Sequence, residues 1–598
     1  MAKTKHTTEI QAYRINFVYF ILMLVVCVLV WRVLDLQVLN KSFLKDQGNA
    51  RVLRELEVTA HRGMITDRNG YPLAISTPVS SIWINAREFS QHTENSTDKR
   101  ANQKNSQIYQ LAKILDLNSQ SLKNKIKKRA DKEFVYIKRR ISPDLAQKVM
   151  DLSIKGIHTQ REYQRFYPDG EVFGHVLGFT DVDDNGQEGM ELAYDEWLSG
   201  VSGSKRVVKD RLGRIISIEE QISAPQPGKV LSLSLDRSIQ YLAYKTLQKT
   251  VQKHKAKSGS IVVLDIESGE IMAMASQPGF NPNRAEDRKT QLYRNRAIAD
   301  LFEPGSTMKP IAIAAALNSG RFSPGTQIET GDGWFMIGRK TIKDTHANGT
   351  IDVSTVLQKS SNVGTAKIAL ALPKPLLWDT FYSFGFGSDT GSGFPGESAG
   401  RLKRPRRISK IEQAVLSFGY GMSVTNLQLT NAYSMIAREG EKKDVTFLST
   451  ADAQQESANV QLQTIAGKVS LSSRSLKQVS KMMEGVVKKG GTAPKAAVVG
   501  YKVAGKTGTV KKSSKHGGYT KKSYSAVFAG FAPVDKPKLA IVVMIDEPNN
   551  GVYYGGLVAA PAFSDVMSGA LRFLNIEPDD ISQPDMVSQI EESIGRQG

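Results

Sequence analysis

The sequence predicts an α/β fold in which helices flank one antiparallel sheet, and two distant stretches carry this prediction. "GSIVVLDIESGEIMAMASQPGF", residues 259–280, has two apolar runs separated by a polar turn, which is typical of a β-hairpin. "SYSAVFAGFAPVDKPKLAIVVMID", residues 523–546, has the same pattern. The segment between them is helical in places, as in "MKPIAIAAALNSG", which ends at the helix-terminating Gly320. Strands at both ends with helices between them predict a single sheet closed by the two extremes of the domain.

Composition narrows the class of protein. A chain of 598 residues, 40% hydrophobic and 23% charged, is long enough for several globular domains. The formal net charge of +21 favours anionic surroundings such as phospholipid head groups or acidic polymers. We find no signature of a nucleic-acid-binding module, and we expect no nucleic-acid partner. Cys27 is the only cysteine, and the eight histidines show no H-E-x-x-H pattern, so neither a disulfide nor a metal site is expected.

The first forty residues predict a membrane anchor. Residues 15–31, "INFVYFILMLVVCVLVW", are apolar almost throughout and would extend roughly 26 Å as a helix, just enough for a bilayer core. No small-x-small cleavage site follows, which indicates an uncleaved signal anchor over residues 15–39 after a cytoplasmic tail of residues 1–14. Positive charges on the two sides nearly balance, so charge alone sets the orientation weakly.

The rest of the chain divides by composition. Residues 40–222 form a mixed, basic and strand-rich N-terminal domain. "SAPQPGKV", residues 223–230, has the proline and glycine spacing of a linker. The predicted α/β domain covers residues 231–575. Residues 576–598 form an acidic, polar tail that we expect to be flexible, with one short helix at most.

"VGYKVAGKTGTV", residues 499–510, allows two functional interpretations. Gly500, Gly505, Lys506 and Thr507 match the nucleotide-binding pattern G-x-x-x-x-G-K-T. "AIVVMIDE", forty residues later, resembles a magnesium-binding strand. However, a P-loop must open a helix, and "GTVKKSSKHGGYTKKSY" shows no helical period after the lysine. The alternative is a K-T-G-T strand that binds substrate, which this context favours.

A second motif, "GESAG" at residues 396–400, formally matches the G-x-S-x-G elbow of esterases. That elbow requires a strand before it and a helix after it. The flanking segments "GSDTGSGFP" and "RLKRPRR" have the composition of loops. We therefore expect a chance match in a glycine-rich loop.

The third constellation begins with Ser306-Thr307-Met308-Lys309, an S-x-x-K pattern after a Pro-Gly loop. The helix predicted to begin near Ser306 would place Lys309 on the same face, one turn on. The serine would lie at the positive end of the helix dipole, where a developing oxyanion is favoured. A buried lysine can have its pKa lowered enough to act as a base, which would replace the missing catalytic histidine.

Two further segments complete this constellation. Ser360-Ser361-Asn362 follows 54 residues after Ser306 and is, by itself, as typical of a helix cap as of a catalytic site. On a strand of Lys506-Thr507-Gly508-Thr509, the lysine is expected to face a cleft. Its charge and the threonine hydroxyls suit a substrate carboxylate, and Gly508 would let a bound peptide approach the backbone. The three motifs in this order are those of penicillin-binding proteins and related β-lactamases.

The chain resembles the class B penicillin-binding proteins, especially the septal peptidoglycan D,D-transpeptidases (FtsI type) of Gram-negative bacteria. "FEPGSTMKP", "KSSNVGTAK" and "GKTGT" are similar to the catalytic motifs of that family. "HRGMITDRNGYPLA", "RFYP", "GFTDVDDNGQEGMELAYDEWLSGVSG" and "DRSIQ" are similar to its elongated α+β pedestal, the dimerisation-type domain. The resemblance therefore implies a transpeptidase domain with the penicillin-binding/β-lactamase-like fold after the pedestal.

The resemblance also implies roles for individual residues. Ser306 would be the acyl-ester nucleophile and Lys309 its base, Ser360 would relay a proton to the leaving D-alanine, and Asn362 would hold the substrate amide. The terminal carboxylate would be bound by Lys506, Thr507 and Thr509 on the K-T-G-T strand, which includes Gly508. Backbone N–H groups of Ser306 and Thr509 would form the oxyanion hole.

The implied activity is cross-linking of cell-wall stem peptides at the division septum, with β-lactams acylating the same serine and no cofactor required. The implied location is the inner membrane, with a cytoplasmic N-terminus and a periplasmic catalytic domain. The implied partners are stem peptides, a membrane glycosyltransferase of the FtsW type and other division proteins. Three alternatives stay open: a D,D-carboxypeptidase, a β-lactamase, and a protein that acts chiefly as a division scaffold. A β-lactamase is disfavoured because the catalytic domain has no E-x-x-L-N segment for deacylation.

Overall fold

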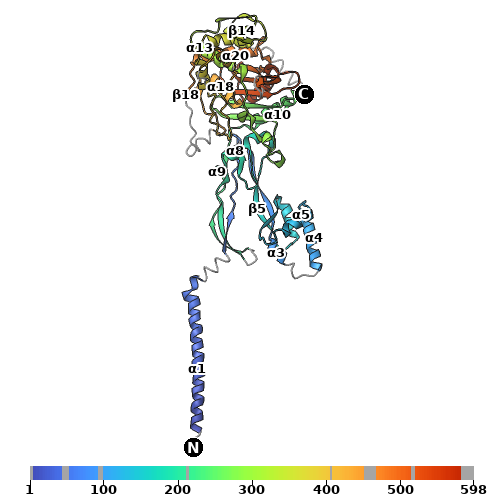
Figure 1. Cartoon of the computed structure of the whole chain (residues 1–598), viewed down its shortest axis with the longest axis vertical. Helices are drawn as coiled ribbons and strands as arrows, with labels where there is room; N and C mark the ends of the chain where they lie inside the picture. The colour runs from blue at the N-terminus through green and yellow to red at the C-terminus, as the bar shows by residue number, and fades with distance from the viewer. Residues whose placement is uncertain are drawn as a thin grey trace. The chain divides into compact units, whose positions relative to one another are not determined.

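A computed structural model describes residues 4–43, 53–91, 98–209, 215–403, 407–449, 467–513 and 519–580 (Figure 1). Contacts divide the chain into two compact units. Unit 1 comprises Met1–His61, Pro78–Tyr163 and Gly200–Pro227, and unit 2 comprises Arg62–Thr77, Gln164–Ser199 and Gly228–Gly598. Residues 40–222 thus contribute to both units. The domain boundaries expected from composition, at residues 222 and 230, stay a prediction.

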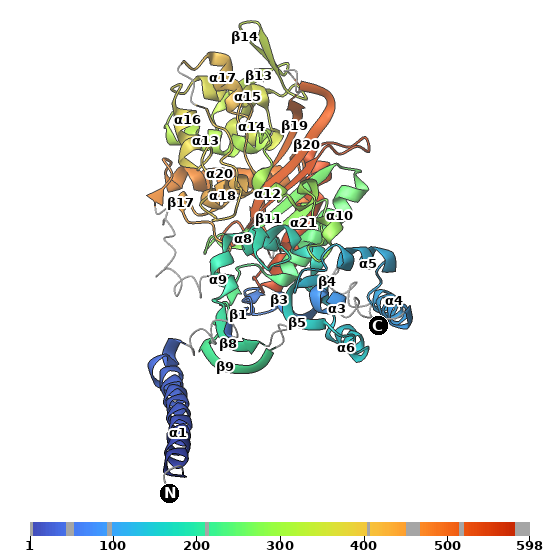
Figure 2. The ribbon, with the colours of Figure 1, turned by 60° about the horizontal axis from the view of Figure 1, so that its bottom comes forward.

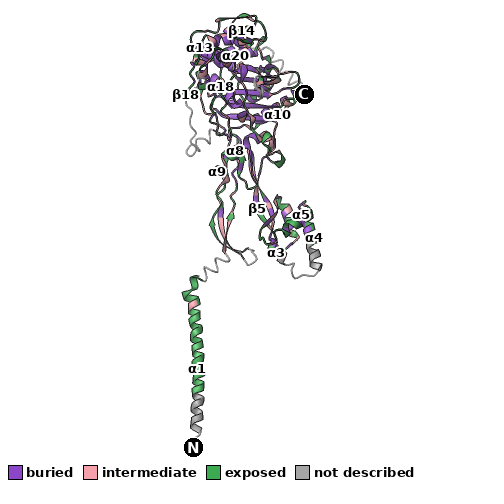
Figure 3. Cartoon of the chain, in the orientation of Figure 1, coloured by how far each residue is buried: buried purple, intermediate pink, exposed green. Residues whose placement is uncertain are grey.

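The chain begins with the apolar helix α1 (Thr4–Leu34), followed by the short helical segment η1 (Asp35–Leu39). Within Tyr13–Leu39, an 18-residue window reaches a mean hydropathy of 2.7, and the residues of this stretch are exposed along almost its whole length (Figure 3). An apolar helix of this length can cross the hydrocarbon core of a bilayer. The helix is therefore compatible with the predicted single-pass anchor.

Unit 1 contains a sheet and a helical lobe. The sheet has three antiparallel strands in the order β1–β8–β9 (Leu53–Val58, Gly203–Lys209 and Ile215–Ser223). The strands of the lobe are part of β3 (Pro72–Ile84) and its partners β4 (Val135–Ile141) and β5 (Ile157–Phe166). Its helices are α3 (Ala86–Gln91), α4 (Asp98–Ile114), α5 (Ser119–Lys127) and α6 (Pro143–Asp151). The lobe has its own core, which includes Ile82, Leu111 and Val149.

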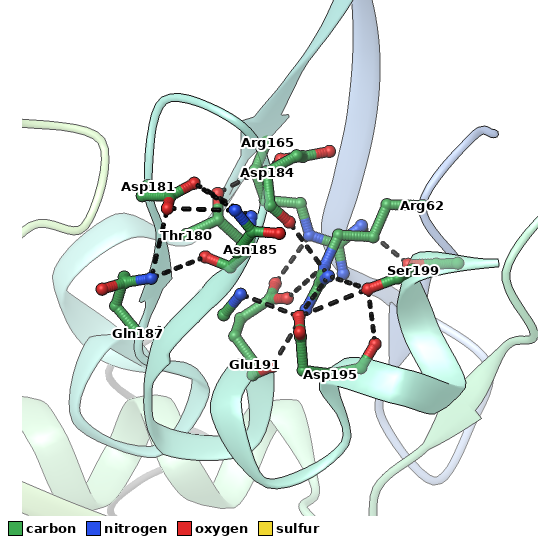
Figure 4. Close-up of polar contacts among 12 residues, drawn as sticks. Arg62, Arg165, Thr180, Asp181, Asp184, Asn185, Gln187, Glu191, Asp195 and Ser199 are labelled. Atoms are coloured by element: carbon green, nitrogen blue, oxygen red, sulfur yellow. Dashed lines mark hydrogen bonds and ion pairs between the residues drawn. The ribbon is translucent and has the colours of Figure 1, made fainter. Parts of the chain in front are cut away.

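The N-terminal segments of unit 2 are held by a buried ion-pair cluster (Figure 4). The Glu191 carboxylate accepts from Arg62 Nε at 2.8 Å and from Arg165 Nε at 2.6 Å, and all three side chains are buried. Arg62 Nη1 also donates to Asp195 Oδ1 at 2.7 Å. Removing one partner of a buried ion pair typically costs about 3–5 kcal/mol, because a charge is left uncompensated. The cluster explains how Arg62, Arg165 and Glu191 can be buried although all three are charged.

Short elements carry this cluster and its surroundings: β2 (Ile65–Thr66), η2 (Gly170–Val172), α7 (Gly174–Leu177), β6 (Phe179–Thr180), β7 (Gly186–Glu188), α8 (Gly189–Ala193), α9 (Asp195–Ser199) and β10 (Leu231–Ser232). Strand β10 pairs with β2 in parallel, although the two are far apart in the sequence. This pairing ties residues 62–77 to the start of the C-terminal part of the same unit.

The main sheet of unit 2 has five strands in the order β12–β11–β21–β20–β19, and every neighbouring pair is antiparallel. The strands are β11 (Ser258–Asp265), β12 (Ile271–Gln277), β19 (Ala504–Ser513), β20 (Tyr519–Ala532) and β21 (Leu539–Asp546). The two predicted hairpins are β11–β12 and β20–β21, and they meet where β11 pairs with β21. The prediction of one antiparallel sheet flanked by helices is confirmed.

Helices cover both faces of this sheet (Figure 2). Alternate residues of β21 face opposite cores: Val543 packs in the core that includes α10 (Arg237–Lys253) and α21 (Gly555–Phe573). Val542 packs in the core that includes α18 (Asn426–Ala437) and α20 (Ser473–Val487). Burial on both faces explains why β21 reads as a continuous apolar run rather than an alternating one.

The helical part of unit 2 surrounds one buried helix, α13 (Lys309–Asn318). Its residues from Lys309 to Leu317 are all buried, and a helix that is apolar on all sides belongs inside a core. It contacts α14 (Val353–Lys359), α15 (Asn362–Leu370), α16 (Leu376–Ser383) and α20, and α17 (Lys410–Leu416) packs on α15. Two small antiparallel pairs complete this part, β13 with β16 (Gln327–Gly331 and Gly349–Asp352) and β14 with β15 (Trp334–Ile337 and Lys340–Lys343).

The remaining short elements are η3 (Ala285–Asp287), α11 (Thr290–Tyr293), α12 (Arg296–Ala299), η4 (Gly305–Met308), β17 (Glu441–Lys442), β18 (Gly467–Lys468) and η5 (Pro494–Ala496). The start of the predicted flexible tail is hydrogen-bonded to the domain. Tyr501 Oη donates to Ile576 O at 2.5 Å, and Asp579 Oδ1 accepts from Lys502 N at 2.7 Å. Residues 581–598, which hold the rest of the predicted tail, lie outside the described residues.

Candidate active site

Ser306 lies in η4, one turn of 3-10 helix that comes directly before α13. It therefore precedes the α-helix and is not its first residue. Gly305 has a φ of +57°, and a Cβ at this position would lie 2.3 Å from Val510 Cγ2 on β19. Gly305 N donates to Gly419 O at 3.2 Å, and Tyr433 Oη donates to Thr307 O at 2.8 Å. The turn is thus pinned on both sides, which leaves Ser306 half-buried at the edge of a cleft.

Lys309, the first residue of α13, is fully buried, and its ammonium group contacts the second motif. Nζ lies 2.6 Å from Ser360 O, 3.2 Å from Ser360 Oγ and 2.8 Å from Asn362 Oδ1. Burial lowers the pKa of Lys309 to about 7, against the opposing effect of the Asp344 carboxylate. Near neutral pH, a large fraction of Lys309 is therefore an uncharged amine that can accept a proton.

This pKa predicts the pH dependence of the first chemical step. Below the pKa, Lys309 carries a proton and cannot accept another, and above it the free amine is available. The rate of acylation by a penicillin is therefore expected to rise about tenfold between about pH 6 and pH 8. Stopped-flow or quenched-flow acylation of the full-length protein in detergent measures this profile. A rate that is flat or falls over this range contradicts the assignment.

Ser360 is the residue of the second motif with the least usual backbone. It follows α14 with φ 61° and ψ 39°, in the left-handed region that residues other than glycine rarely adopt. The next residue, Ser361, caps α15 by accepting from Gly364 N at 2.8 Å. The turn between the two helices thereby directs Ser360 O and the Asn362 side chain to Lys309. A strained backbone at a functional motif is consistent with a position fixed by function.

Asn362 has both ends of its side-chain amide engaged. Oδ1 accepts from Lys309 Nζ, and Nδ2 donates to Lys343 O at 2.9 Å. In this arrangement Asn362 orients Lys309. Holding a substrate amide, the role implied by the resemblance, would require an exchange of one of these contacts, and it stays a prediction.

Asp344 is a site residue that the sequence analysis missed. Its Oδ1 accepts from Asn362 N at 2.5 Å and from Val363 N at 3.0 Å, at the N-terminus of α15. Its Oδ2 accepts from Ser361 Oγ at 2.5 Å. A carboxylate is favoured there by the helix dipole and by the unsatisfied N–H groups of the first turn. Asp344 therefore positions Ser361 and Asn362 of the second motif.

Replacing Asp344 with asparagine is expected to shift the midpoint of the acylation profile to lower pH. Burial lowers the pKa of Lys309 and the negative charge of Asp344 raises it. When the charge of Asp344 is removed, the effect of burial is less compensated and the pKa of Lys309 falls further. The lost charge-assisted hydrogen bonds should also reduce stability by about 1.5–3 kcal/mol. Ser361→Ala is the matched control, because it removes the two hydrogen bonds of the Ser361 hydroxyl, to Asp344 Oδ2 and from Gly364 N, but keeps the Asp344 charge, and its midpoint should stay in place. An unchanged or higher midpoint in Asp344→Asn is the contrary result.

The third motif lies on β19, at one edge of the main sheet. Lys506 is fully buried, with Nζ 3.3 Å from Thr507 Oγ1, so the expectation of a lysine exposed to the cleft is wrong. Burial lowers the pKa of Lys506 well below its usual value, and the nearby charge of Lys309 lowers it further. The two threonines line the cleft: Thr507 contacts Thr492 Oγ1 at 3.0 Å, and Thr509 Oγ1 accepts from Gly555 N at 2.9 Å.

Gly508 has a packing neighbour that the sequence analysis did not anticipate. A Cβ at this position would lie 3.0 Å from Pro304 O and 3.1 Å from Thr307 Cγ2. A side chain would therefore push β19 away from the turn that carries Ser306. Gly508 thus allows β19 to pack closely against the turn that carries Ser306. The close approach of a bound peptide at Gly508 stays a prediction.

The motifs meet at one cleft of about 920 Å³ within unit 2. Residues from all three motifs line it: Ser306, Ser360, Ser361, Asn362, Thr507 and Thr509. A stack of tyrosines forms part of the wall, with ring centroids of Tyr524 and Tyr553 4.1 Å apart and those of Tyr553 and Tyr554 4.6 Å apart. The cleft is large enough for a short peptide.

The structure also places the competing motifs. The lysine of the nucleotide pattern lies within strand β19 and does not open a helix, whereas a P-loop lysine lies at the start of the helix that binds the phosphates. Asp546 and Glu547 are paired with Lys512 Nζ at 2.8 and 2.7 Å. Among the described residues, no cluster of three or more metal-ligating side chains is present. Ser398 lies in a loop and donates its backbone N–H to Ile298 O, so the esterase elbow is absent.

Comparisons with known proteins agree with this geometry. Residues 259–568 match the penicillin-binding protein transpeptidase domain, and residues 57–233 match the penicillin-binding protein dimerisation domain. The chain is 40% identical to the peptidoglycan D,D-transpeptidase FtsI of Escherichia coli K12, over 94% of this chain and 92% of that protein. It is 38% identical to the probable peptidoglycan D,D-transpeptidase PbpC of Pseudomonas aeruginosa, over 97% of this chain and 99% of that protein.

A solved structure gives the same result. Penicillin-binding protein 3 of Mycobacterium tuberculosis, complexed with aztreonam, superposes with a TM-score of 0.64 at 26% identity. The match covers 88% of this chain and 98% of that structure. The similarity thus extends through both matched domains.

Proposed function

This chain belongs to the class B penicillin-binding proteins, with a dimerisation domain and a transpeptidase domain, and from that premise we propose how its residues act. It is a peptidoglycan D,D-transpeptidase, a serine acyl-transfer enzyme. The observation that carries the residue assignment is the contact of buried Lys309 with Ser360 and Asn362 beside Ser306.

In the first half-reaction, Ser306 Oγ attacks the carbonyl carbon between the two terminal D-alanines of a donor stem peptide. Uncharged Lys309 Nζ accepts the hydroxyl proton. The developing oxyanion is stabilised by the backbone N–H groups of Ser306 and Thr509. The C–N bond then breaks, its nitrogen receives a proton through Ser360 Oγ, and D-alanine leaves.

Binding of the donor uses the strand at one edge of the sheet. Strand β19 ends the strand order, so an extended peptide can pair with its backbone as an added strand. Thr507 and Thr509 hydroxyls line the cleft and would bind the terminal carboxylate. The buried charge of Lys506, when present, would act on that carboxylate through Thr507.

In the second half-reaction, a primary amine of a neighbouring stem peptide attacks the acyl-ester carbonyl. The amine loses a proton to the basic group of the site, the C–O bond to Ser306 breaks, and the hydroxyl is restored. The product is an amide cross-link. A β-lactam enters the same first step, but its ring-opened acyl group stays attached because no leaving fragment departs.

Product analysis tests this assignment. The full-length protein in detergent is incubated with a D-Ala–D-Ala stem pentapeptide and an excess of a second stem peptide with a free amine. We expect a cross-linked dimer and one D-alanine per cross-link. Tetrapeptide without dimer indicates a carboxypeptidase, and clearance of a penicillin within seconds indicates a β-lactamase.

The activity is proposed to take place at the division septum, with a membrane glycosyltransferase of the FtsW type and other division proteins as partners. The support is the relation to FtsI. A tagged copy should collect at mid-cell during division. A copy distributed along the lateral wall, or a Ser306→Ala variant that fully supports division, contradicts this role.

The anchor is proposed to place residues 1 to about 14 in the cytoplasm and the catalytic domain outside, since the substrate is cell-wall peptide. The helix itself is compatible with either direction. A reporter fused to the C-terminus should be active only when it is of the kind that works outside the cytoplasm. Activity of a strictly cytoplasmic reporter reverses the orientation.

A further inference from the structure

A second cleft of about 1070 Å³ lies in unit 2, and Tyr420 lines both this cleft and the catalytic one. Its volume exceeds that of the catalytic cleft and suits a ligand of several residues. None of the three catalytic motifs contributes to its lining. The donor peptide and the chemistry described above leave this cleft unused.

The second cleft adjoins the nucleophile through a short, well-ordered wall. Glu303, which lines it, precedes Ser306 by three residues and accepts from Gly421 N at 3.0 Å. Gly305 N donates to Gly419 O, and Phe302 pairs with Val424 through two backbone hydrogen bonds of 3.0 and 2.9 Å. Residues 302–305 and 419–424 therefore run side by side between the serine turn and the second cleft.

The lining combines exposed cations, the two carboxylates of Glu303 and Glu412, and an aromatic surface. The Glu412 carboxylate accepts from Ser409 N at 2.8 Å and from Ser409 Oγ at 2.7 Å. The backbone of Arg401 is held by two hydrogen bonds to Ser423, of 2.7 and 2.9 Å, and its side chain is exposed. Lys403 is also exposed. Within the part of the chain that the structure describes, neither cation forms an ion pair. Trp378 on α16 adds an aromatic face that stacks on Tyr382 at a centroid distance of 5.3 Å.

This chemistry fits the second substrate of a two-substrate reaction. Cross-linking needs a place for a peptide whose amine must reach the acyl group on Ser306. Such an acceptor carries carboxylates, which Arg401 and Lys403 can bind. Its ammonium and amide groups suit the aromatic face of Trp378. Tyr420, at the junction of both clefts, lies where the amine would pass from one to the other.

We propose that the cleft lined by Glu303, Trp378, Arg401, Lys403 and Tyr420 binds the acceptor, a short peptide with a primary amine and at least one carboxylate. The proposal rests on the proposed transpeptidase mechanism and adds its second binding site. The Arg401 and Lys403 side chains hold the carboxylate end of the acceptor. The amine then extends past Tyr420 toward the acyl-ester carbonyl.

The test measures how one acyl-enzyme divides between water and two amines. The full-length protein in detergent is acylated by a D-alanyl thioester in the presence of either D-alanine or a stem tripeptide with a free side-chain amine. We expect Arg401→Glu and Lys403→Glu to lower the ratio of tripeptide aminolysis to hydrolysis at least tenfold, through a higher KM for the tripeptide. The corresponding ratio for D-alanine, which is too small to span the cleft, should change less than threefold.

Lys249→Glu is the matched control, because it makes the same charge change at an exposed position on α10, which covers the other face of the sheet. It should leave both ratios unchanged. The proposal is overturned if the ratio of tripeptide aminolysis to hydrolysis is unchanged in both Arg401→Glu and Lys403→Glu. It is also overturned if the aminolysis ratios for D-alanine and for the tripeptide fall equally. Absence of any acyl-enzyme in the unmodified protein would instead refute the proposed role of Ser306, so the two failures are distinguishable.

Discussion

Replacing Ser306 with alanine is expected to abolish covalent labelling by penicillin completely, because the variant lacks the oxygen that forms the ester. The side chain is half-buried and loses only a hydroxyl, so the free energy of unfolding should change by about 0.5 kcal/mol or less. Gel fluorescence with a labelled penicillin measures the adduct, and thermal unfolding in detergent measures stability.

Ser398→Ala is the matched control for this variant, because Ser398 is the serine of the competing G-x-S-x-G match and lies in a loop. It should be labelled as fully as the unmodified protein. Residual labelling of a folded Ser306→Ala variant would show that another nucleophile reacts with penicillin.

Replacing Lys309 with methionine is expected to slow acylation by about 10²–10⁴-fold, the range that a positioned general base contributes. Methionine fills a similar volume in the buried site but cannot accept a proton. The loss of Nζ also leaves Ser360 O and Asn362 Oδ1 without their donor, which should cost about 1–3 kcal/mol of stability.

The rate constant at saturating penicillin separates these two effects, because it is measured on the folded fraction. The acylation that remains in Lys309→Met should also lose the rise with pH through the pKa of about 7. A variant within tenfold of the normal rate, or one that keeps the pH profile, shows that another group accepts the proton.

The main sheet could be predicted because its strands have strong local signals. β11, β12 and β21 are almost entirely buried on both faces, so each reads as a short apolar run bounded by a turn. The packing of residues 62–77 and 164–199 into unit 2 could not be predicted in this way. It depends on contacts such as Arg62 with Glu191, 129 residues apart, and on two-residue strands such as β2 and β10.

At the active site, the motif residues were predictable from type and spacing, but their surroundings were not. The burial of Lys506 depends on the packing of β19 against the serine turn, which no local pattern encodes. Asp344 lies 18 residues before Asn362, in a loop with no motif. The N-terminus of α15 requires an acceptor for its N–H groups, but the sequence does not distinguish Asp344 from its neighbours Asp332 and Asp352.

The most direct test of the central claim is mass spectrometry of the full-length protein after brief exposure to a penicillin, without ATP or magnesium. We predict a single adduct on the peptide that contains Ser306. Because the proposed mechanism assigns no residue to activate water, hydrolysis of the adduct should face a barrier of roughly 21 kcal/mol or more. This barrier corresponds to a rate constant of about 10⁻³ s⁻¹ or slower. A folded protein that forms no adduct, or forms it on another residue, contradicts the account.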